Sequence, residues 1–165
     1  MHVFRISNKI ETKKSNVWSG RGVFAKSDIK KGEVLIDIEA KITGIPSDYT
    51  LQINESEYLV ADYIDNLINH SCNPNILIKL YTQNKKRVSY IALKNIKKGQ
   101  ELFWNYNTTE LDLVTKFICR CSSKKCIGKI SGAKYLTKKQ VNKILPLMSS
   151  YIKMKVTRAS RQRGD

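Results

Sequence analysis

Short runs of alternating apolar and polar residues fill the first 115 positions of the chain. A period of two is typical of β-strands, because successive side chains point to opposite faces of a strand. Turns separate the runs roughly every 8–12 residues, as in compact β folds. The pattern predicts a loop over the polar residues 11–22 and strands over residues 3–6, 22–25, 34–38, 51–53, 58–60, 76–81 and 87–93.

The end of the chain follows a helical period instead. Thr137 is the predicted N-cap of a helix, and Gln140, three residues later, completes a capping box. We expect Pro146 to break this helix and a second helical segment to lie near residues 149–156. Residues 158–165 are basic, small and polar, which predicts a disordered tail.

A length of 165 residues fits one domain with a single core. No apolar run reaches the roughly 18 residues that a membrane helix requires. The first residues also lack the apolar stretch of a secretory signal. We therefore expect an intracellular protein, cytoplasmic or nuclear, with no membrane partner. The sequence leaves the oligomeric state open.

The net charge of +16 is unevenly distributed along the chain. Residues 116–165 carry 14 basic side chains and one acidic side chain. Residues 42–78 contain no Lys or Arg but five acids, which are Asp48, Glu55, Glu57, Asp62 and Asp65. A field of this kind attracts different partners to different faces of a protein.

The cysteines indicate a metal site. Cys119, Cys121 and Cys126 form a C-x-C-x4-C cluster, and thiolates brought this close repel one another unless a cation neutralises them. Zn2+ does so, with a preference for four N or S ligands in a tetrahedron. The candidates for the fourth ligand are Cys72, His2 and His70. Free thiols and disulfides are the competing interpretations.

Four motifs, in this order along the chain, resemble those of the SET domain of protein lysine methyltransferases. Residues 20–25 (GRGVFA) resemble the opening G-x-G strand, and residues 69–75 (NHSCNPN) match the N-H-S-C-x-P-N signature. Residues 99–106 (GQELFWNY) resemble the G-E-E-L-T-F-D-Y segment, and residues 119–126 match the post-SET cysteine cluster. The ordered set of four is more specific than any single motif.

The resemblance implies a mainly β fold of several small, curved sheets. In that fold the C-terminal segment threads beneath a preceding loop in a knot-like core, where residues 69–75 and 101–106 would meet. The chain would divide into a SET domain (1–115), a post-SET zinc-binding loop (116–132), a C-terminal helical extension (133–157) and the tail (158–165).

The activity that the resemblance implies is transfer of a methyl group from S-adenosylmethionine to a lysine side chain of a protein, such as a histone or another basic protein. A free lysine amine has a pKa near 10.4 and is mostly protonated, so the site must favour the neutral amine and align it. Two alternatives stay open: an inactive SET-like module that binds a lysine peptide, and a zinc-pinned nucleic-acid-binding protein.

The same resemblance suggests a role for individual residues. Tyr106 would be the catalytic tyrosine, and Tyr49 would face the lysine channel together with Trp104, which stands where the family has Phe or Tyr. The cofactor would contact Gly20, Arg21, Gly22, Asn69, His70, Tyr106 and Phe117, with His70 and Phe117 near its adenine. Cys72, Cys119, Cys121 and Cys126 would form a closed structural zinc site.

The charge pattern takes on meaning within this resemblance. In the family, the segment before the N-H-S-C signature helps to line the peptide groove, so its five acids would attract a basic substrate. Acids that are merely solvated are the plainer interpretation. The basic C-terminal third would contact nucleic acid or another acidic surface beside the substrate.

Overall fold

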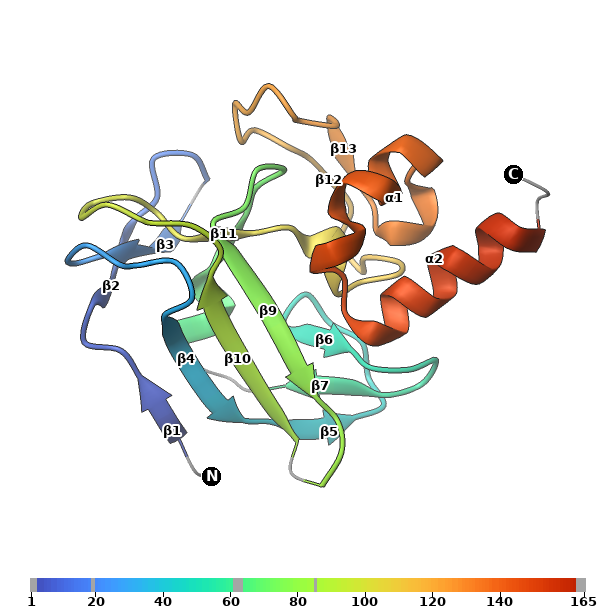
Figure 1. Cartoon of the computed structure of the whole chain (residues 1–165), viewed down its shortest axis with the longest axis horizontal. Helices are drawn as coiled ribbons and strands as arrows, with labels where there is room; N and C mark the ends of the chain where they lie inside the picture. Colours follow the sequence, from blue (N-terminus) through green and yellow to red (C-terminus); the bar gives the residue numbers. More distant parts are fainter. Residues whose placement is uncertain (1–2, 19, 61–63, 85, 163–165) are drawn as a thin grey trace.

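The computed structural model describes residues 3–18, 20–60, 64–84 and 86–162, which form mostly short strands in five small sheets, with helices near the C-terminus (Figure 1). The predicted mainly β fold is therefore confirmed. The largest sheet is antiparallel throughout. Its strands, in spatial order, are β1 (Val3–Ile6), β4 (Val34–Glu39), β10 (Arg87–Ala92) and β9 (Ile76–Tyr81).

Three smaller antiparallel sheets surround it. They are β2 (Ile10–Lys14) with β3 (Arg21–Ala25), β5 (Lys41–Thr43) and β6 (Thr50–Gln52) on either side of β7 (Tyr58–Val60), and β12 (Phe117–Ile118) with β13 (Lys129–Ile130). The prediction of a loop over residues 11–22 is wrong for residues 11–14. This segment lacks an apolar alternation, but it pairs along its whole length with β3, so the partner strand holds it extended.

A fifth sheet joins two segments that are distant in sequence. β8 (Asn69–His70) runs parallel to β11 (Phe103–Trp104). The Asn75 side chain extends the contact, because it donates to the Glu101 carbonyl at 2.8 Å and accepts from the Phe103 N–H at 2.7 Å. The two segments that we expected to meet do meet. The threading of the chain end beneath a loop stays a prediction.

The apolar residues of these strands form the main core. Val23, Ile36, Ile38, Leu59 and Val88 are each no more than 1% exposed. Four of the five described sheets therefore contribute side chains to one core, and only the sheet of β12 and β13 does not. This core supports the loops on which the site residues lie.

The helical end of the chain follows the predicted capping chemistry. The N-cap Thr137 and Gln140 form the expected capping box at the start of α1 (Lys138–Ile144). Pro146 lies in the short 3-10 segment η4 (Leu145–Leu147) that ends α1, as expected. The other 3-10 segments are η1 (Ile64–Leu67), η2 (Tyr106–Thr108) and η3 (Ala133–Tyr135).

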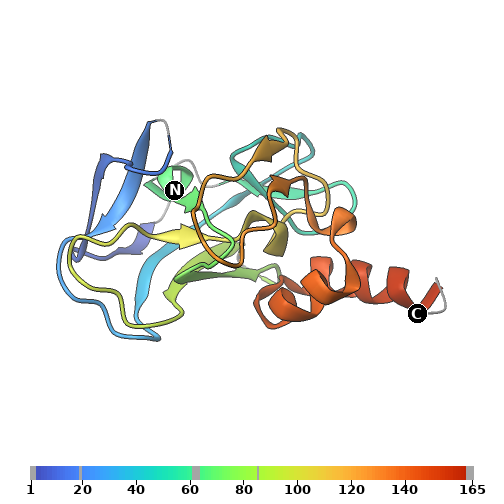
Figure 2. The same cartoon turned by 90° about the horizontal axis from the view of Figure 1, so that it is seen from above.

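The last helix is longer than we expected. α2 (Ser150–Gln162) begins near the predicted second segment but continues five residues into the tail predicted to be disordered. Ile152 and Val156 are buried against Ala133, and this anchor lets the helix propagate through residues that are good helix formers. Residues 163–165 lie outside the described residues. Figure 2 shows α1 and α2 at the end of the molecule away from β2 and β3.

None of the described helices is long and apolar enough to span a membrane.

Candidate active site and cysteine cluster

A cleft of about 510 Å3 lies where β8 and β11 meet the segments 47–50 and 113–117. This volume lies within the usual range for small-molecule sites. Among the residues that line it are seven of the predicted site residues: Arg21, Tyr49, Asn69, His70, Trp104, Tyr106 and Phe117. The fold therefore gathers residues from opposite halves of the chain around one cavity.

A much narrower recess of about 30 Å3 adjoins this cleft. The two cavities share Tyr49, Trp104 and Tyr106 as wall residues, and the recess adds Asp65 and Tyr90. A volume of this size is about the space of one water molecule in the liquid. The site thus has two parts, a wide cleft and a narrow aromatic recess.

Tyr106 and Trp104 converge on one carbonyl group. The Tyr106 hydroxyl and the Trp104 indole N–H each donate to the Ile68 carbonyl oxygen at 3.1 Å. Burial, together with the neighbouring Asp48 and Tyr49, raises the pKa of Tyr106 above its ordinary value. Tyr106 therefore keeps its proton and acts here as a hydrogen-bond donor. No motif in the sequence indicates that the Ile68 carbonyl takes part.

His70 lies in the cleft wall and connects two parts of the site. Its Nδ1 accepts the backbone N–H of Tyr106 at 3.1 Å, so the ring proton lies on Nε2, which is 3.5 Å from the Cys72 sulfur. Burial lowers the pKa of His70 to about 3, so the ring is neutral. The fourth member of the cysteine cluster is therefore Cys72, and His70 only contacts it. His2, the other candidate, lies outside the described residues.

Sequence reasoning missed Trp18. Its indole N–H donates to the His70 carbonyl at 3.1 Å, and its ring meets the Phe117 ring edge-on at 5.3 Å between centroids. Ser15 holds this segment, because its hydroxyl accepts the Trp18 N–H and donates to Glu101. A tryptophan two residues before the G-x-G motif was the available signal.

We expected Gly22 to lie against the cofactor, but in the structure it lies against the Glu101 side chain. A Cβ added at Gly22 would lie 2.1 Å from the Glu101 carboxylate oxygen, so no other residue fits without a shift. The Asn69 side chain donates to the same carboxylate at 2.7 Å and to the Arg21 carbonyl at 3.0 Å. Gly20 and Gly22 do not line the cleft. Their contact with a cofactor stays a prediction.

A second carboxyl group, Glu110, was also missed. It lines the cleft and accepts the Gln52 N–H at 3.3 Å. Burial raises its pKa well above the ordinary value, so it holds a proton more readily than an exposed glutamate does. Its place after Tyr106 and before the cysteine cluster was the only signal in the sequence.

The acidic segment does not form one continuous surface. Glu55 forms an ion pair with Lys155 at 2.9 Å, and Glu57 accepts a hydrogen bond from the Asn54 side chain. Asp48 lines both cavities and Asp65 lines only the recess. Asp62 lies outside the described residues. Of the described acids in this segment, Asp48 and Asp65 line these two cavities, and the lining of a peptide groove by the segment stays a prediction.

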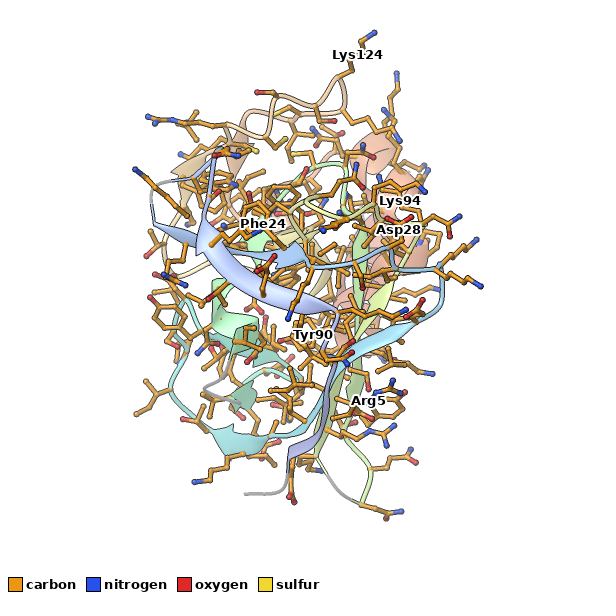
Figure 3. All side chains as sticks on the ribbon, turned by 90° about the vertical axis from the view of Figure 1, so that its left-hand side faces the viewer. Arg5, Phe24, Asp28, Tyr90, Lys94 and Lys124 are labelled. Carbon is orange, nitrogen blue, oxygen red and sulfur yellow. The ribbon has the colours of Figure 1, made fainter. Side chains whose placement is uncertain are left out.

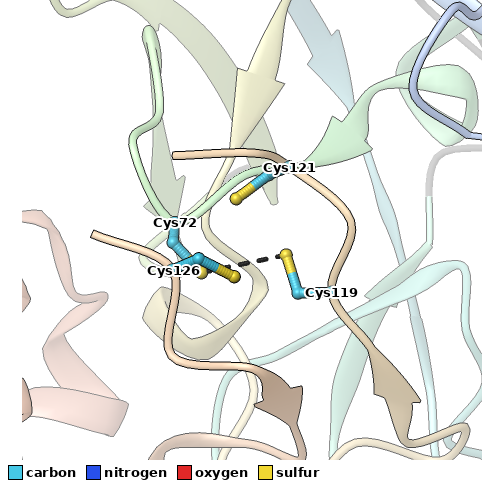
Figure 4. Close-up of side chains that lie close together, drawn as sticks. All are labelled: Cys72, Cys119, Cys121 and Cys126. Atoms are coloured by element: carbon cyan, nitrogen blue, oxygen red, sulfur yellow. Dashed lines mark hydrogen bonds between the residues drawn. The ribbon is translucent and has the colours of Figure 1, made fainter. Parts of the chain in front are cut away.

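All four cysteines come together, as Figure 4 shows. Their sulfur atoms lie within 4.8 Å of one another, and those of Cys72 and Cys119 are 3.9 Å apart. A tetrahedral zinc ion with Zn–S bonds of about 2.3 Å needs sulfur atoms about 3.8 Å apart. The donor set and its spacing fit this ion, and four sulfur ligands would leave no position open.

Without a cation, burial keeps two of these thiols protonated. Burial raises the pKa of Cys72 to about 12 and that of Cys119 above its ordinary value. Burial also opposes ionisation of Cys121, but hydrogen bonds from the backbone of Cys72 and Ser123 lower its pKa to about 7. Four thiolates would not coexist in so small a volume without a neutralising cation.

The SET domain family model matches residues 20–107. The chain belongs to the SET-domain family. The match spans more than half of the chain and contains the cleft residues from Arg21 to Tyr106. Within the SET domain, β8 carries the N-H-S-C signature and β11 carries the segment that precedes Tyr106.

Several curated relatives have histone-lysine methyltransferase names, and the chain spans only a small part of the length of each relative. It is 31% identical over 159 residues to the variant-silencing SET domain-containing protein of Plasmodium falciparum, which covers 78% of this chain and 6% of that protein. Human histone-lysine N-methyltransferase 2B is 28% identical over 125 residues, which is 65% of this chain and 5% of that protein.

Solved structures agree with this family. A crystallised candidate histone methyltransferase of Plasmodium falciparum is 27% identical, with a TM-score of 0.54 over 61% of this chain and 95% of that chain. A chain of the polycomb repressive complex 2 from Chaetomium thermophilum is 26% identical, with a TM-score of 0.51 over 59% of this chain and 15% of that chain.

Proposed function

We propose that this SET-domain protein transfers a methyl group from S-adenosylmethionine to a lysine side chain of a basic protein, such as a histone. The observation that carries the proposal is the convergence of the Tyr106 hydroxyl and the Trp104 indole on the Ile68 carbonyl, at the junction of the cleft and the recess. A reaction between two substrates that enter from different sides requires such a junction.

The wide cleft would hold the cofactor, which supplies a sulfonium methyl group when bound. Asn69 and His70 contribute its polar wall, and Phe117 contributes an aromatic face. Arg21 lies at the rim, where its guanidinium donates to the Thr12 carbonyl and hydroxyl oxygens. These groups come from fixed strands, so the cleft is largely formed before any ligand enters.

The narrow recess, which has room for about one water molecule, would hold only the amine end of the lysine side chain. Its aromatic walls, Tyr49, Trp104 and Tyr106, exclude water from an extended alkyl chain. The Tyr106 hydroxyl keeps its proton and donates it to the Ile68 carbonyl, so it does not remove the ammonium proton itself. Its oxygen would accept an N–H of the amine, which leaves the amine lone pair free to face the methyl group. Trp104 is 9% exposed, and its bulk leaves little free volume beside the amine.

The four cysteines would hold one structural Zn2+. His70 connects this site to the cleft, because its Nε2–H points at Cys72 while its Nδ1 accepts from the backbone of Tyr106. Hydrogen bonds to ligating atoms of this kind orient the ligands of a metal. The zinc would therefore hold the segment that carries Phe117 against the cleft.

A second partner surface is suggested by exposed basic side chains at one end of the molecule. These are Arg120, Lys124 and Lys125 between β12 and β13, Lys129 on β13, Lys138, Lys139 and Lys143 on α1, and Lys153 and Arg158 on α2. Figure 3 shows Lys124 projecting from its loop. Lys125 and Lys143 line one cavity of about 380 Å3, so the loop and α1 form a continuous surface.

We propose that this basic surface contacts nucleic acid beside a protein substrate, since residues 116–162 contain no acid to neutralise it. This role would place the protein on chromatin or another nucleic-acid-bound substrate. The inactive peptide-binding module and the nucleic-acid-binding protein without methyl transfer are the competing functions. Tyr106 and the intact cleft favour transfer over both.

The first prediction concerns transfer itself. Wild-type protein incubated with labelled S-adenosylmethionine and mixed histones should place label on lysine, and Tyr106→Phe should reduce the rate by about 10- to 1000-fold, because the hydroxyl that orients the amine is lost. Tyr135→Phe, which alters an exposed tyrosine on η3, is the matched control. Cofactor binding without transfer by the wild type would favour the inactive module.

The second prediction concerns zinc. Cys121→Ser should lower the bound zinc, measured by elemental analysis, and abolish transfer while circular dichroism still shows most of the β structure. Lys124→Ser in the same loop should retain both zinc and activity. Full activity in protein stripped of zinc would refute the structural role of the ion.

The third prediction concerns the basic surface. Combined substitution of Lys138, Lys139 and Lys143 by Glu should weaken binding to duplex DNA at least tenfold, measured by fluorescence anisotropy, and flatten the dependence of log affinity on log salt. The same charge change at the exposed Lys30, Lys31 and Lys94, on other loops, is the control. Equal losses in both triple variants would mean that only net charge matters.

A further inference from the structure

The recess contains a buried acid that the proposed reaction has not used. Asp65 on η1 is 7% exposed and accepts a hydrogen bond from the Tyr90 hydroxyl at 2.9 Å. Tyr90 on β10 is 2% exposed, and Figure 3 places it inside the molecule. Both side chains line the recess together with Trp104 and Tyr106, and neither lines the wide cleft.

The charged and titratable groups around the recess share one sign. Those that line it are Asp48, Asp65, Tyr49, Tyr90 and Tyr106, and none of the described lining residues is Lys, Arg or His. β3 also packs against η1 and contributes Arg21, but that guanidinium donates to Thr12 at the surface. The recess is therefore lined by two carboxyl groups and by no described basic side chain, inside a protein whose net charge is +16.

Tyr90 fixes this arrangement. Burial and the nearby Asp65 both raise the pKa of Tyr90, so the hydroxyl keeps its proton and donates it to the carboxylate. The hydrogen bond holds the carboxylate in one orientation without neutralising its charge. A buried carboxylate interacts more strongly with a cation than an exposed one, because water does not screen it.

We infer that Asp65, oriented by Tyr90, is a specificity-determining residue that recognises the positive charge of the lysine entering the recess. The inference rests on the proposed lysine-directed function. An ammonium group loses its hydration when it enters an apolar recess, and a fixed anion offsets that loss, whereas an uncharged side chain of equal length gains nothing from it.

The same anion has a cost in the chemical step. A carboxylate near the bound ammonium stabilises its charged form and so raises its pKa. Transfer needs the neutral amine, so the rate should rise with pH until the bound lysine loses its proton. Asp65 would thus strengthen the binding of the lysine but shift the rise of the transfer rate to higher pH.

The test compares two peptides on three proteins. The peptides are the N-terminal tail of histone H3 and the same tail with every lysine replaced by norleucine, which keeps the chain length and removes the charge. Affinities are measured by calorimetry with S-adenosylhomocysteine present, on wild type, Asp65→Asn and Asp37→Asn. Asp37 is the matched control, because it also accepts from a hydroxyl group, that of Ser89 at 2.9 Å, and does not line the recess.

We expect the lysine-to-norleucine affinity ratio to fall about tenfold in Asp65→Asn, equivalent to about 1.4 kcal/mol, and to stay unchanged in Asp37→Asn. Asparagine can still accept from Tyr90, and each ratio is measured on one folded sample, so lost stability does not imitate the effect. The same ratio in wild type and Asp65→Asn would overturn the inference, as would equal falls in both variants or failure of wild type to bind either peptide.

A second readout follows the pH dependence of methyl transfer to the lysine peptide. Asp65→Asn should move the rising part of the rate profile to lower pH, because the bound lysine then loses its proton more easily. A purely structural role would lower the rate at all pH values alike. If the affinity ratio falls in Asp65→Asn as expected but wild type transfers no methyl group, the proposed function fails and the role of Asp65 in charge recognition stands.

Discussion

The parallel pairing of β8 with β11 is the constraint on which the rest of the site depends. The Ser71 N–H donates to the Trp104 carbonyl at 2.9 Å, and the Asn75 N–H donates to the Phe103 carbonyl at 3.0 Å. These bonds place the segment after Ile68 beside the segment before Tyr106, so that Asn69, His70 and Trp104 line the same cleft. Without them, His70 would not reach Tyr106 and Cys72 would not reach the other cysteines.

Three acidic side chains take different positions around this pairing. Glu101 joins the N-terminal segment to Asn69 behind the cleft, whereas Glu110 lies in the cleft wall and Asp65 in the recess. Their environments differ, because Glu101 accepts from two side chains and Glu110 is raised in pKa by burial. A strongly basic protein thus keeps acidic side chains in or behind the walls of the two cavities, while exposed basic side chains cover the helical end.

Much of the fold could be predicted because local chemistry and tertiary structure agree. The capping box at Thr137, the break at Pro146 and the hairpin of β9 and β10 each depend on neighbours in sequence. β2 was missed because its pairing with β3, and not its own composition, makes it a strand. The end of α2 was missed because its anchor, Ala133, lies in another element.

In the candidate site, too, some features follow from local sequence and others from contacts across the fold. The family resemblance predicted seven of the residues that line the cleft and the grouping of the four cysteines, since most of those signals lie in the motifs themselves. Trp18, the Ile68 carbonyl, Glu110 and the Asp65–Tyr90 pair could not be found this way. Each acquires its role from a contact across the fold, and a backbone carbonyl leaves no mark in a sequence at all.

Hydrogen exchange of the zinc-loaded protein, with and without S-adenosylhomocysteine, tests most directly whether this cleft is the cofactor site. The account predicts slower exchange in the segments that line the cleft, residues 66–70, 104–106 and 113–117, with no change in the turns at residues 29–33 and 96–99. Exchange that stays the same in the cleft segments, or protection confined to another part of the surface, would contradict it.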